Sequence, residues 1–139
     1  MSTSYSGGCC CGAVRYTCSS EPMMPGHCQC NYCRKLSGSA HASMFALPKQ
    51  ALNLQGELKF FEFTADSGNR VRRGFCTECG SPVYNENLAM PDLAFLHASS
   101  LDDPEIFQPG IVIFTDSAVS WDRVDPNLTR FPGMPPMSG

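Results

Sequence analysis

The sequence predicts a single, mainly β domain, and three observations support this class. The chain has 139 residues, a usual length for one domain. Its 12 glycines and 11 prolines are spread along the chain and divide it into short segments. Most of these segments are rich in Val, Ile, Phe and Tyr, which favour strands. We therefore expect one domain over residues 1–139, built from short antiparallel strands and long connections.

Seven segments are expected to form strands, because each combines strand-favouring residues with turn residues at its ends. In chain order they are residues 14–18, 42–47, 58–63, 71–75, 93–98, 111–114 and 119–121. One short helix is expected over residues 31–37, and Gly38 is expected to end it.

Charge and hydropathy exclude two classes of partner. The net charge is -3, and no basic stripe with interleaved aromatic residues is present, so we expect no nucleic-acid partner. No apolar run approaches the roughly 18 residues of a membrane span, so we expect no membrane partner. Residues 1–8 lack the basic and apolar regions of a signal peptide. We therefore expect a cytoplasmic protein whose thiols stay reduced.

Cysteine is the most informative residue type in this chain. The count of nine is odd, which does not suit a fully paired disulfide framework, and in a reducing compartment it points to metal binding. Seven of the nine fall into three groups with metal-ligand spacing: C-x-C at Cys9 and Cys11, C-x-C-x-x-C at Cys28, Cys30 and Cys33, and C-x-x-C-G at Cys76 and Cys79.

The two cysteine pairs together supply four thiolates, which is the ligand set of a closed, structural zinc site. Such a site would join the N-terminal part of the chain to its middle and add zinc-binding energy to fold stability. The alternative is that the two pairs are unrelated. Cys10 should face away from a metal held by its neighbours, and Cys18 should be a small buried residue of a strand.

The cysteine triplet supplies three thiolates and leaves one zinc position open, as catalytic zinc sites do. The N–H groups at the start of the expected helix would stabilise anionic sulfur there. A metal with an open position deprotonates an incoming thiol, so the triplet suits thiol chemistry. Three alternatives remain open: His27 as a fourth ligand, an iron–sulfur cluster completed by Cys18 or Cys10, and a cysteine triplet that binds no metal.

Three motifs, with a weaker fourth, carry a resemblance to a known family. They are Gly7-Gly8-Cys9-x-Cys11-Gly12, His27-Cys28-Gln29-Cys30-x-x-Cys33-Arg34-Lys35, Arg73-Gly74-Phe75-Cys76-x-x-Cys79-Gly80 and Leu101-Asp102-Asp103-Pro104. In this order they resemble the glutathione-dependent formaldehyde-activating enzyme family, over about residues 7–135. The family often has His where this chain has Gln29.

The resemblance implies a β-tent fold with zinc knuckles and two zinc ions per chain. The four paired cysteines would hold the structural ion, and the triplet would hold the catalytic ion. The reaction would be that of a carbon–sulfur lyase, joining glutathione to formaldehyde to give S-(hydroxymethyl)glutathione. The partners would be a small thiol and a small carbonyl. An alternative is a non-catalytic, zinc-structured binding or chaperone-like β-tent module.

Several polar residues are candidates to contact the substrates. Glutathione carries two carboxylates, so cations should line its pocket, and Arg34, Lys35 and Arg73 lie beside the motif cysteines. His41 and His97 are candidate proton shuttles, although each can equally be a structural histidine.

Overall fold

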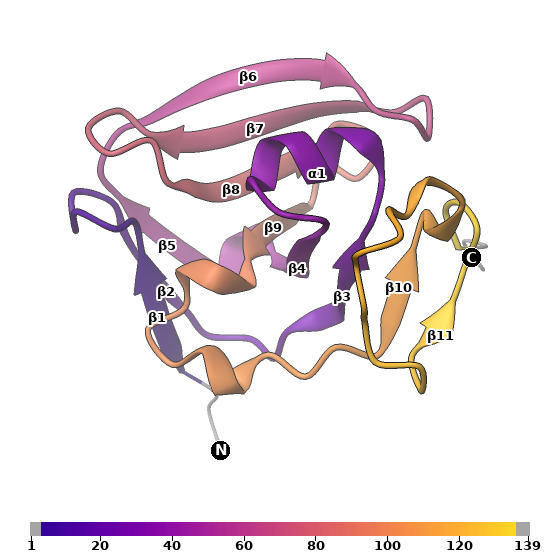
Figure 1. Ribbon diagram of the computed structural model, residues 1–139. Coiled ribbons are helices and arrows are strands. Elements are labelled where there is room, and N and C mark those ends of the chain that lie inside the picture. Colours follow the sequence, from indigo (N-terminus) through magenta and orange to yellow (C-terminus); the bar gives the residue numbers. More distant parts are fainter. Residues whose placement is uncertain (1–3, 136–139) are drawn as a thin grey trace.

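Two β-sheets form the body of the computed structural model, which describes residues 4–135 (Figure 1). Residues 1–3 and 136–139 of the expected domain lie outside the described part. The strands are β1 Tyr5–Gly8, β2 Arg15–Cys18, β3 Met23–Cys28, β4 Ala42–Pro48, β5 Leu52–Gln55, β6 Leu58–Thr64, β7 Arg70–Cys76, β8 Pro82–Asn87, β9 Leu93–His97, β10 Ile111–Ile113 and β11 Thr129–Arg130. The helix α1 is Asn31–Ser37. Short 3-10 turns span Lys49–Ala51, Ala98–Ser100, Pro104–Ile106 and Thr115–Ser117. The mainly β class is confirmed.

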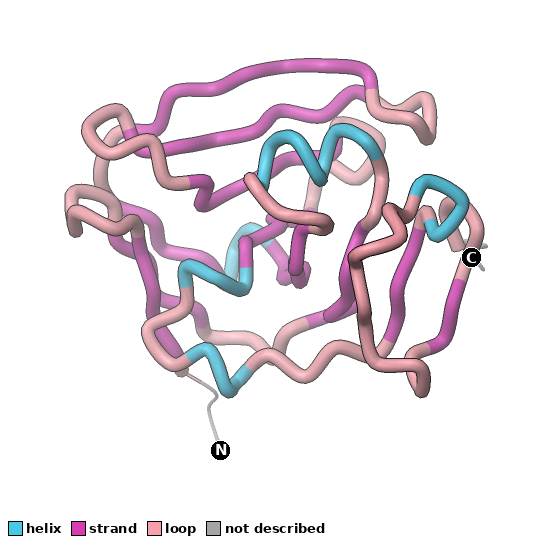
Figure 2. Tube along the Cα trace, viewed as in Figure 1, coloured by secondary structure: helices cyan, strands magenta, loops and turns pink. Residues whose placement is uncertain are grey.

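The smaller sheet has the strand order β1-β2-β5, and the larger has the order β11-β10-β3-β4-β9-β8-β7-β6. Neighbouring strands are antiparallel, except that β10 runs parallel to both β3 and β11. Figure 2 shows the long connections between strands, which the glycines and prolines predicted. In the described part of the chain, no helix is long and apolar enough to cross a membrane.

Six of the seven expected strands are present, with ends that differ by one residue at most. The seventh, residues 119–121, is wrong. The N–H of Asp122 donates to the carbonyl of Val119 at 3.1 Å, which closes a turn instead. Trp121 in this turn is 66% exposed, so the segment buries too little apolar surface to be held in a sheet.

Five strands were not expected from the sequence, namely β1, β3, β5, β8 and β11. They contain Gly, Pro or Asn, or are only two to four residues long, so no local pattern marks them. The helix was expected with its observed bounds. The Cys30 side chain caps its start by accepting from the Cys33 N–H, and Gly38 ends it in the left-handed conformation with φ 73°.

The core lies between the two sheets. It joins Tyr16 of the small sheet to Phe45, Leu47 and Leu96 of the large one, all at 2% exposure or less. Side chains alternate between the two faces of a strand, so the residues between these core positions project from the opposite face of the large sheet. That second face carries the candidate site.

Candidate functional site

The two cysteine pairs, distant in sequence, meet in space. The sulfur atoms of Cys9, Cys11, Cys76 and Cys79 all lie within 4.8 Å of one another. Cys11 Sγ is 3.6 Å from Cys9 Sγ and 3.7 Å from Cys76 Sγ. A tetrahedral ion with metal–sulfur bonds of about 2.3 Å requires sulfur atoms about 3.8 Å apart. The spacing therefore suits one four-coordinate metal ion.

Local backbone geometry prepares these sulfurs to carry negative charge. The N–H of Val14 donates to Cys9 Sγ at 3.2 Å, and the N–H of Glu78 donates to Cys76 Sγ at 3.3 Å. The Ser81 hydroxyl lies 3.1 Å from Cys79 Sγ, and its hydrogen bond lowers the pKa of the Cys79 thiol to about 5. Such donors compensate the charge of a thiolate cluster.

The two cysteines outside the motifs are separate from this cluster. Cys10 is exposed, and its N–H donates to Ser81 Oγ at 3.0 Å. Cys18 is 1% exposed in β2, and burial raises the pKa of its thiol to about 11. Cys18 is therefore a buried apolar side chain, as expected.

The triplet converges on one point where β3 meets α1. Cys28 is the last residue of β3, Cys30 caps α1, and Cys33 lies in its first turn. Their three sulfurs lie within 4.8 Å of one another, and no described His, Cys, Asp or Glu adds a fourth donor at that distance. Three such sulfurs can be anionic together only beside a cation. The arrangement can hold a metal ion with one position free.

Hydrogen bonds within the triplet shift the pKa values of its thiols in opposite directions. Contacts from Cys28 and Cys33 lower the pKa of Cys30 to about 3, and the N–H of Cys33 donates to Cys30 Sγ at 3.2 Å. The same sulfur contacts raise the pKa of Cys33. Cys30 is thus prepared as a thiolate, and its 4% exposure protects it from solvent.

None of the residues considered as a fourth ligand joins the triplet. His27 neighbours Cys28 on β3 and so projects from the other face, where its Nδ1 lies 2.8 Å from Ser43 Oγ. Cys10 and Cys18 are likewise outside the cluster.

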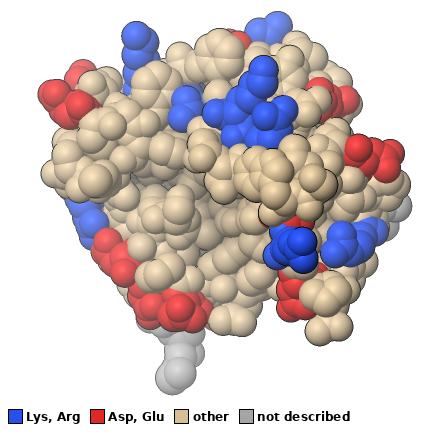
Figure 3. Space-filling model, in the orientation of Figure 1, with Lys and Arg blue, Asp and Glu red and all other residues tan. Residues whose placement is uncertain are grey.

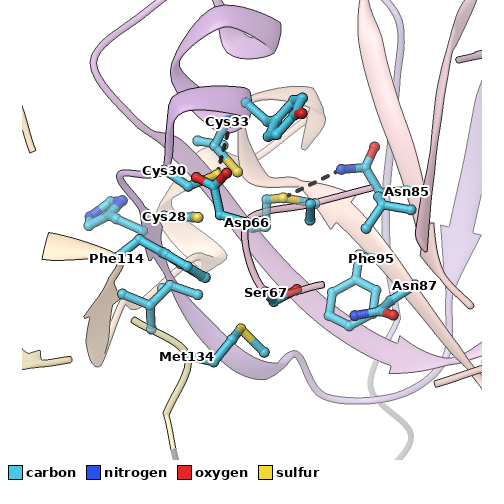
Figure 4. A pocket seen from close by; sticks show the side chains of 18 of the residues that line it. Cys28, Cys30, Cys33, Asp66, Ser67, Asn85, Asn87, Phe95, Phe114 and Met134 are labelled. Atoms are coloured by element: carbon cyan, nitrogen blue, oxygen red, sulfur yellow. Dashed lines mark hydrogen bonds between the residues drawn. The ribbon is translucent and has the colours of Figure 1, made fainter. Parts of the chain in front are cut away.

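A cavity of about 200 Å³ adjoins the triplet. Its floor is the second face of the large sheet, which the pairs Met44–His97, Asn85–Phe95 and Arg73–Asn85 place in register. Helix α1 and the β6–β7 turn form its walls, and Figure 4 shows the triplet and Asn85 at opposite sides of it.

The three basic residues that were expected to contact the substrate lie in different places. Arg73 lines the cavity, and its Nη2 donates to the carbonyl of Leu36 at 3.2 Å. Arg34 and Lys35 lie on α1 and do not line the cavity; Arg34 Nη2 donates to Asn31 Oδ1 at 3.4 Å. Basic atoms gather over the position of α1 in Figure 3.

The two histidines considered as proton shuttles also differ. His41 lies outside the cavity lining, where its Nδ1 is 2.9 Å from an oxygen of Asp122. His97 lines the cavity and is 4% exposed, and burial, with the charge of Arg73, lowers its pKa to about 4. His97 is therefore neutral at pH 7.

Sequence reasoning missed Asn85, Phe95 and Met44 as site residues and did not single out Asp122. The first three lie on the cavity face of neighbouring strands. The alternation of side chains along each strand would have placed them on one face if β8 had been expected. No local signal exists for Asp122, whose carboxylate accepts a hydrogen bond from Gln29, the residue between Cys28 and Cys30.

The chain is similar to one known family and to a solved structure. The family model described as glutathione-dependent formaldehyde-activating enzyme matches residues 4–117. No curated protein matches the sequence at a significant level. The crystal structure of a Rhodobacter sphaeroides protein, a structural genomics target, is 17% identical with a TM-score of 0.55, covering 91% of this chain and 98% of that one. At this identity the likeness shows a shared fold alone. Because the family model spans both cysteine clusters and most of the chain, this protein belongs to the glutathione-dependent formaldehyde-activating enzyme family.

Proposed function

We propose that this protein is a zinc-dependent carbon–sulfur lyase that adds a thiol, such as glutathione, to formaldehyde or a similar small carbonyl. One observation carries the proposal. Three sulfurs meet within 4.8 Å on the wall of a cavity, without a fourth donor from the described His, Cys, Asp and Glu residues. An incomplete ligand set facing a cavity is the arrangement of catalytic sites, whereas a scaffold has no need of one.

The donor sets favour two zinc ions. Thiolates are soft ligands that select zinc over hard cations, and the spacing in the four-cysteine cluster suits tetrahedral coordination. In this proposal Cys9, Cys11, Cys76 and Cys79 hold a structural ion, and the triplet holds a catalytic one. When bound, zinc lowers the pKa of a thiol that takes its open position and keeps that sulfur nucleophilic.

The protein contributes positioning and a largely apolar cavity. The triplet fixes where the substrate sulfur sits, and the cavity brings the carbonyl carbon next to it, which turns a bimolecular addition into a local one. The carbon–sulfur bond forms as the carbonyl π bond opens, and the thiol proton ends on the carbonyl oxygen. The addition is balanced without an oxidant or reductant, and the reverse reaction releases thiol and carbonyl.

The proposal is tested by comparing two cysteine variants that differ only in location. Cys30→Ser removes a buried ligand of the triplet, and Cys10→Ser removes an exposed thiol outside both clusters. Exchange of ¹³C-formaldehyde with glutathione is followed by NMR with and without protein. We expect acceleration by the wild type and by Cys10→Ser, and only the background rate with Cys30→Ser. Equal acceleration by both variants, with zinc absent from the triplet, would contradict the proposal.

A further inference from the structure

Three residues that line the cavity each carry a side-chain polar atom that has no hydrogen-bond partner among the described protein atoms. The atoms are Arg73 Nε, Asn85 Oδ1 and His97 Nε2, each of them buried. Buried polar atoms are nearly always partnered in folded proteins. His97 is 4% exposed, so bulk water does not supply a hydrogen-bond partner for its ring. Unpartnered polar atoms on three residues that line one cavity point to the position of a ligand's polar group.

The sheet register places this trio on one face. Arg73 pairs with Asn85, Asn85 pairs with Phe95, and His97 follows Phe95 by two residues on β9. Residues in such cross-strand rows project to the same side. The electrostatic effect of Arg73 on the pKa of His97 also indicates that the two side chains are close.

The trio lacks a counter-ion. No described carboxylate forms a salt bridge with Arg73 within 4.0 Å. Its guanidinium donates to the carbonyl of Leu36 and lies over the Phe75 ring, 5.0 Å from the ring centroid, and neither contact supplies a negative charge. Glu86 also lines the cavity, but its carboxylate pairs with Lys49 and Arg72. Even partial burial of a guanidinium without a counter-ion is unfavourable, and it lowers the pKa of Arg73. An anion from outside, ideally a planar carboxylate, would relieve this cost.

The rest of the cavity is mostly apolar. Its lining includes Met44, Phe63, Val71, Phe95, Ile111 and Ile113. Its volume of about 200 Å³ is below the roughly 300 Å³ at which pockets begin to enclose drug-sized molecules. Glutathione has two carboxylates, an amine and two amides, and several of these would face apolar walls without partners.

The distance between the triplet and the trio sets the length of the ligand. Cys28 is on β3 and His97 is on β9, and only β4 separates these strands in the sheet. Strand spacing places β3 and β9 about 10 Å apart. A compact molecule can therefore reach from the triplet to His97, the trio member nearest to it in the sheet. Arg73 and Asn85 lie further along the sheet, on β7 and β8, but the Arg73 guanidinium reaches back towards the triplet, where it donates to the carbonyl of Leu36 in α1.

We infer that the cavity takes a compact thiol with an apolar body and a single carboxylate, the carboxylate seated against Arg73, Asn85 and His97. The thiol end of this inference rests on the proposed function, whereas the carboxylate end rests on the trio alone. The triplet receives the sulfur, and Phe95 and Met44 contact the body.

Calorimetric titration of the zinc-loaded full chain with four ligands tests this inference. 4-(Mercaptomethyl)benzoate has the thiol, an apolar ring and the carboxylate. 4-Methylbenzyl mercaptan lacks the carboxylate, 4-methylbenzoate lacks the sulfur, and glutathione is the larger polar thiol. We expect 4-(mercaptomethyl)benzoate to bind about 10- to 100-fold more tightly than 4-methylbenzyl mercaptan, the range for a charge-assisted contact, and more tightly than glutathione.

Neighbouring arginines supply a matched pair of variants. Arg73→Gln should remove the preference for 4-(mercaptomethyl)benzoate over 4-methylbenzyl mercaptan. Arg72→Gln should keep that preference, because Arg72 projects from the other face of β7 towards Glu86. If Arg73→Gln fails to fold, Asn85→Asp provides the test, since a carboxylate beside Arg73 should abolish the same preference.

The outcomes separate the inference from the proposed function. Equal or tighter binding of glutathione, or no gain from the carboxylate, would overturn the inference while thiol binding stands. If 4-methylbenzoate binds as tightly as 4-(mercaptomethyl)benzoate and Arg73→Gln weakens the binding of both, recognition of the carboxylate is supported. The proposed binding of a thiol at the triplet is then contradicted.

Discussion

Asp122 accepts a hydrogen bond from Gln29 Nε2 at 2.9 Å, although the two residues are 93 positions apart. Gln29 lies between Cys28 and Cys30 and is 2% exposed. The same carboxylate lies 2.9 Å from His41 Nδ1. The C-terminal segment thereby holds the loop that carries two of the three candidate ligands.

Removing this carboxylate should weaken metal binding at the triplet. Groups that orient ligands from outside typically contribute 10- to 100-fold to metal affinity, and we expect a loss of about that size for Asp122→Ala. Competition with a chromogenic zinc chelator measures it. Asp116→Ala, which removes an exposed carboxylate of the same part of the chain, is the control. Equal zinc affinity in the two variants would show that Asp122 does not position the triplet.

The four-cysteine cluster should stabilise the fold. Cys76 is 1% exposed, so Cys76→Ser should cost one zinc per chain and about 4 kcal/mol or more of unfolding free energy. Metal content and chemical denaturation measure the two effects. Cys10→Ser should change neither, and a Cys76→Ser protein of wild-type stability would contradict a structural role.

His97 should make stability depend on pH. Its pKa is about 4 in the folded protein and about 6.5 when unfolded, so the unfolded chain binds more protons between these values. The contribution of neutral His97 is complete above pH 6.5 and is lost as the pH falls towards 4. Relative to His97→Gln, the wild type should lose on the order of 3 kcal/mol across this window. Denaturation at a series of pH values checks it, and a constant difference would rule it out.

The core between the sheets offers a matched pair of leucines. Leu96 is fully buried, and Leu96→Ala should lower the free energy of unfolding by about 3 kcal/mol. Leu88 is 43% exposed, and Leu88→Ala should change it by less than about 0.5 kcal/mol. Urea denaturation compares them. Equal losses would mean that Leu96 does not lie in the main core.

The parts of the site that could be predicted from the sequence are those with short-range signals. The three cysteine motifs could be found from the sequence because cysteines on one turn that bind the same ion have a short and fixed spacing. The helix was predicted with its end, since Gly38 supplies the left-handed residue that stops it. Each of these depends on a few consecutive residues.

The cavity could not be predicted in this way. Strand β8 begins at Pro82 and contains Asn85 and Asn87, residues that are typical of loops. It is a strand because β7 and β9 pair with it on both sides, which is a tertiary effect. Without β8, nothing in the sequence aligns Asn85 with Arg73. Asp122 reaches Gln29 across a distance in sequence that no local pattern records.

Native mass spectrometry of the purified protein during titration with glutathione and with 4-(mercaptomethyl)benzoate tests the central claim most directly. The open triplet predicts two zinc ions per chain and one saturable thiol adduct, with the adduct absent in Cys30→Ser. A single zinc ion per chain, or two ions without an adduct of either thiol, would contradict the assignment of the triplet as the thiol-binding centre.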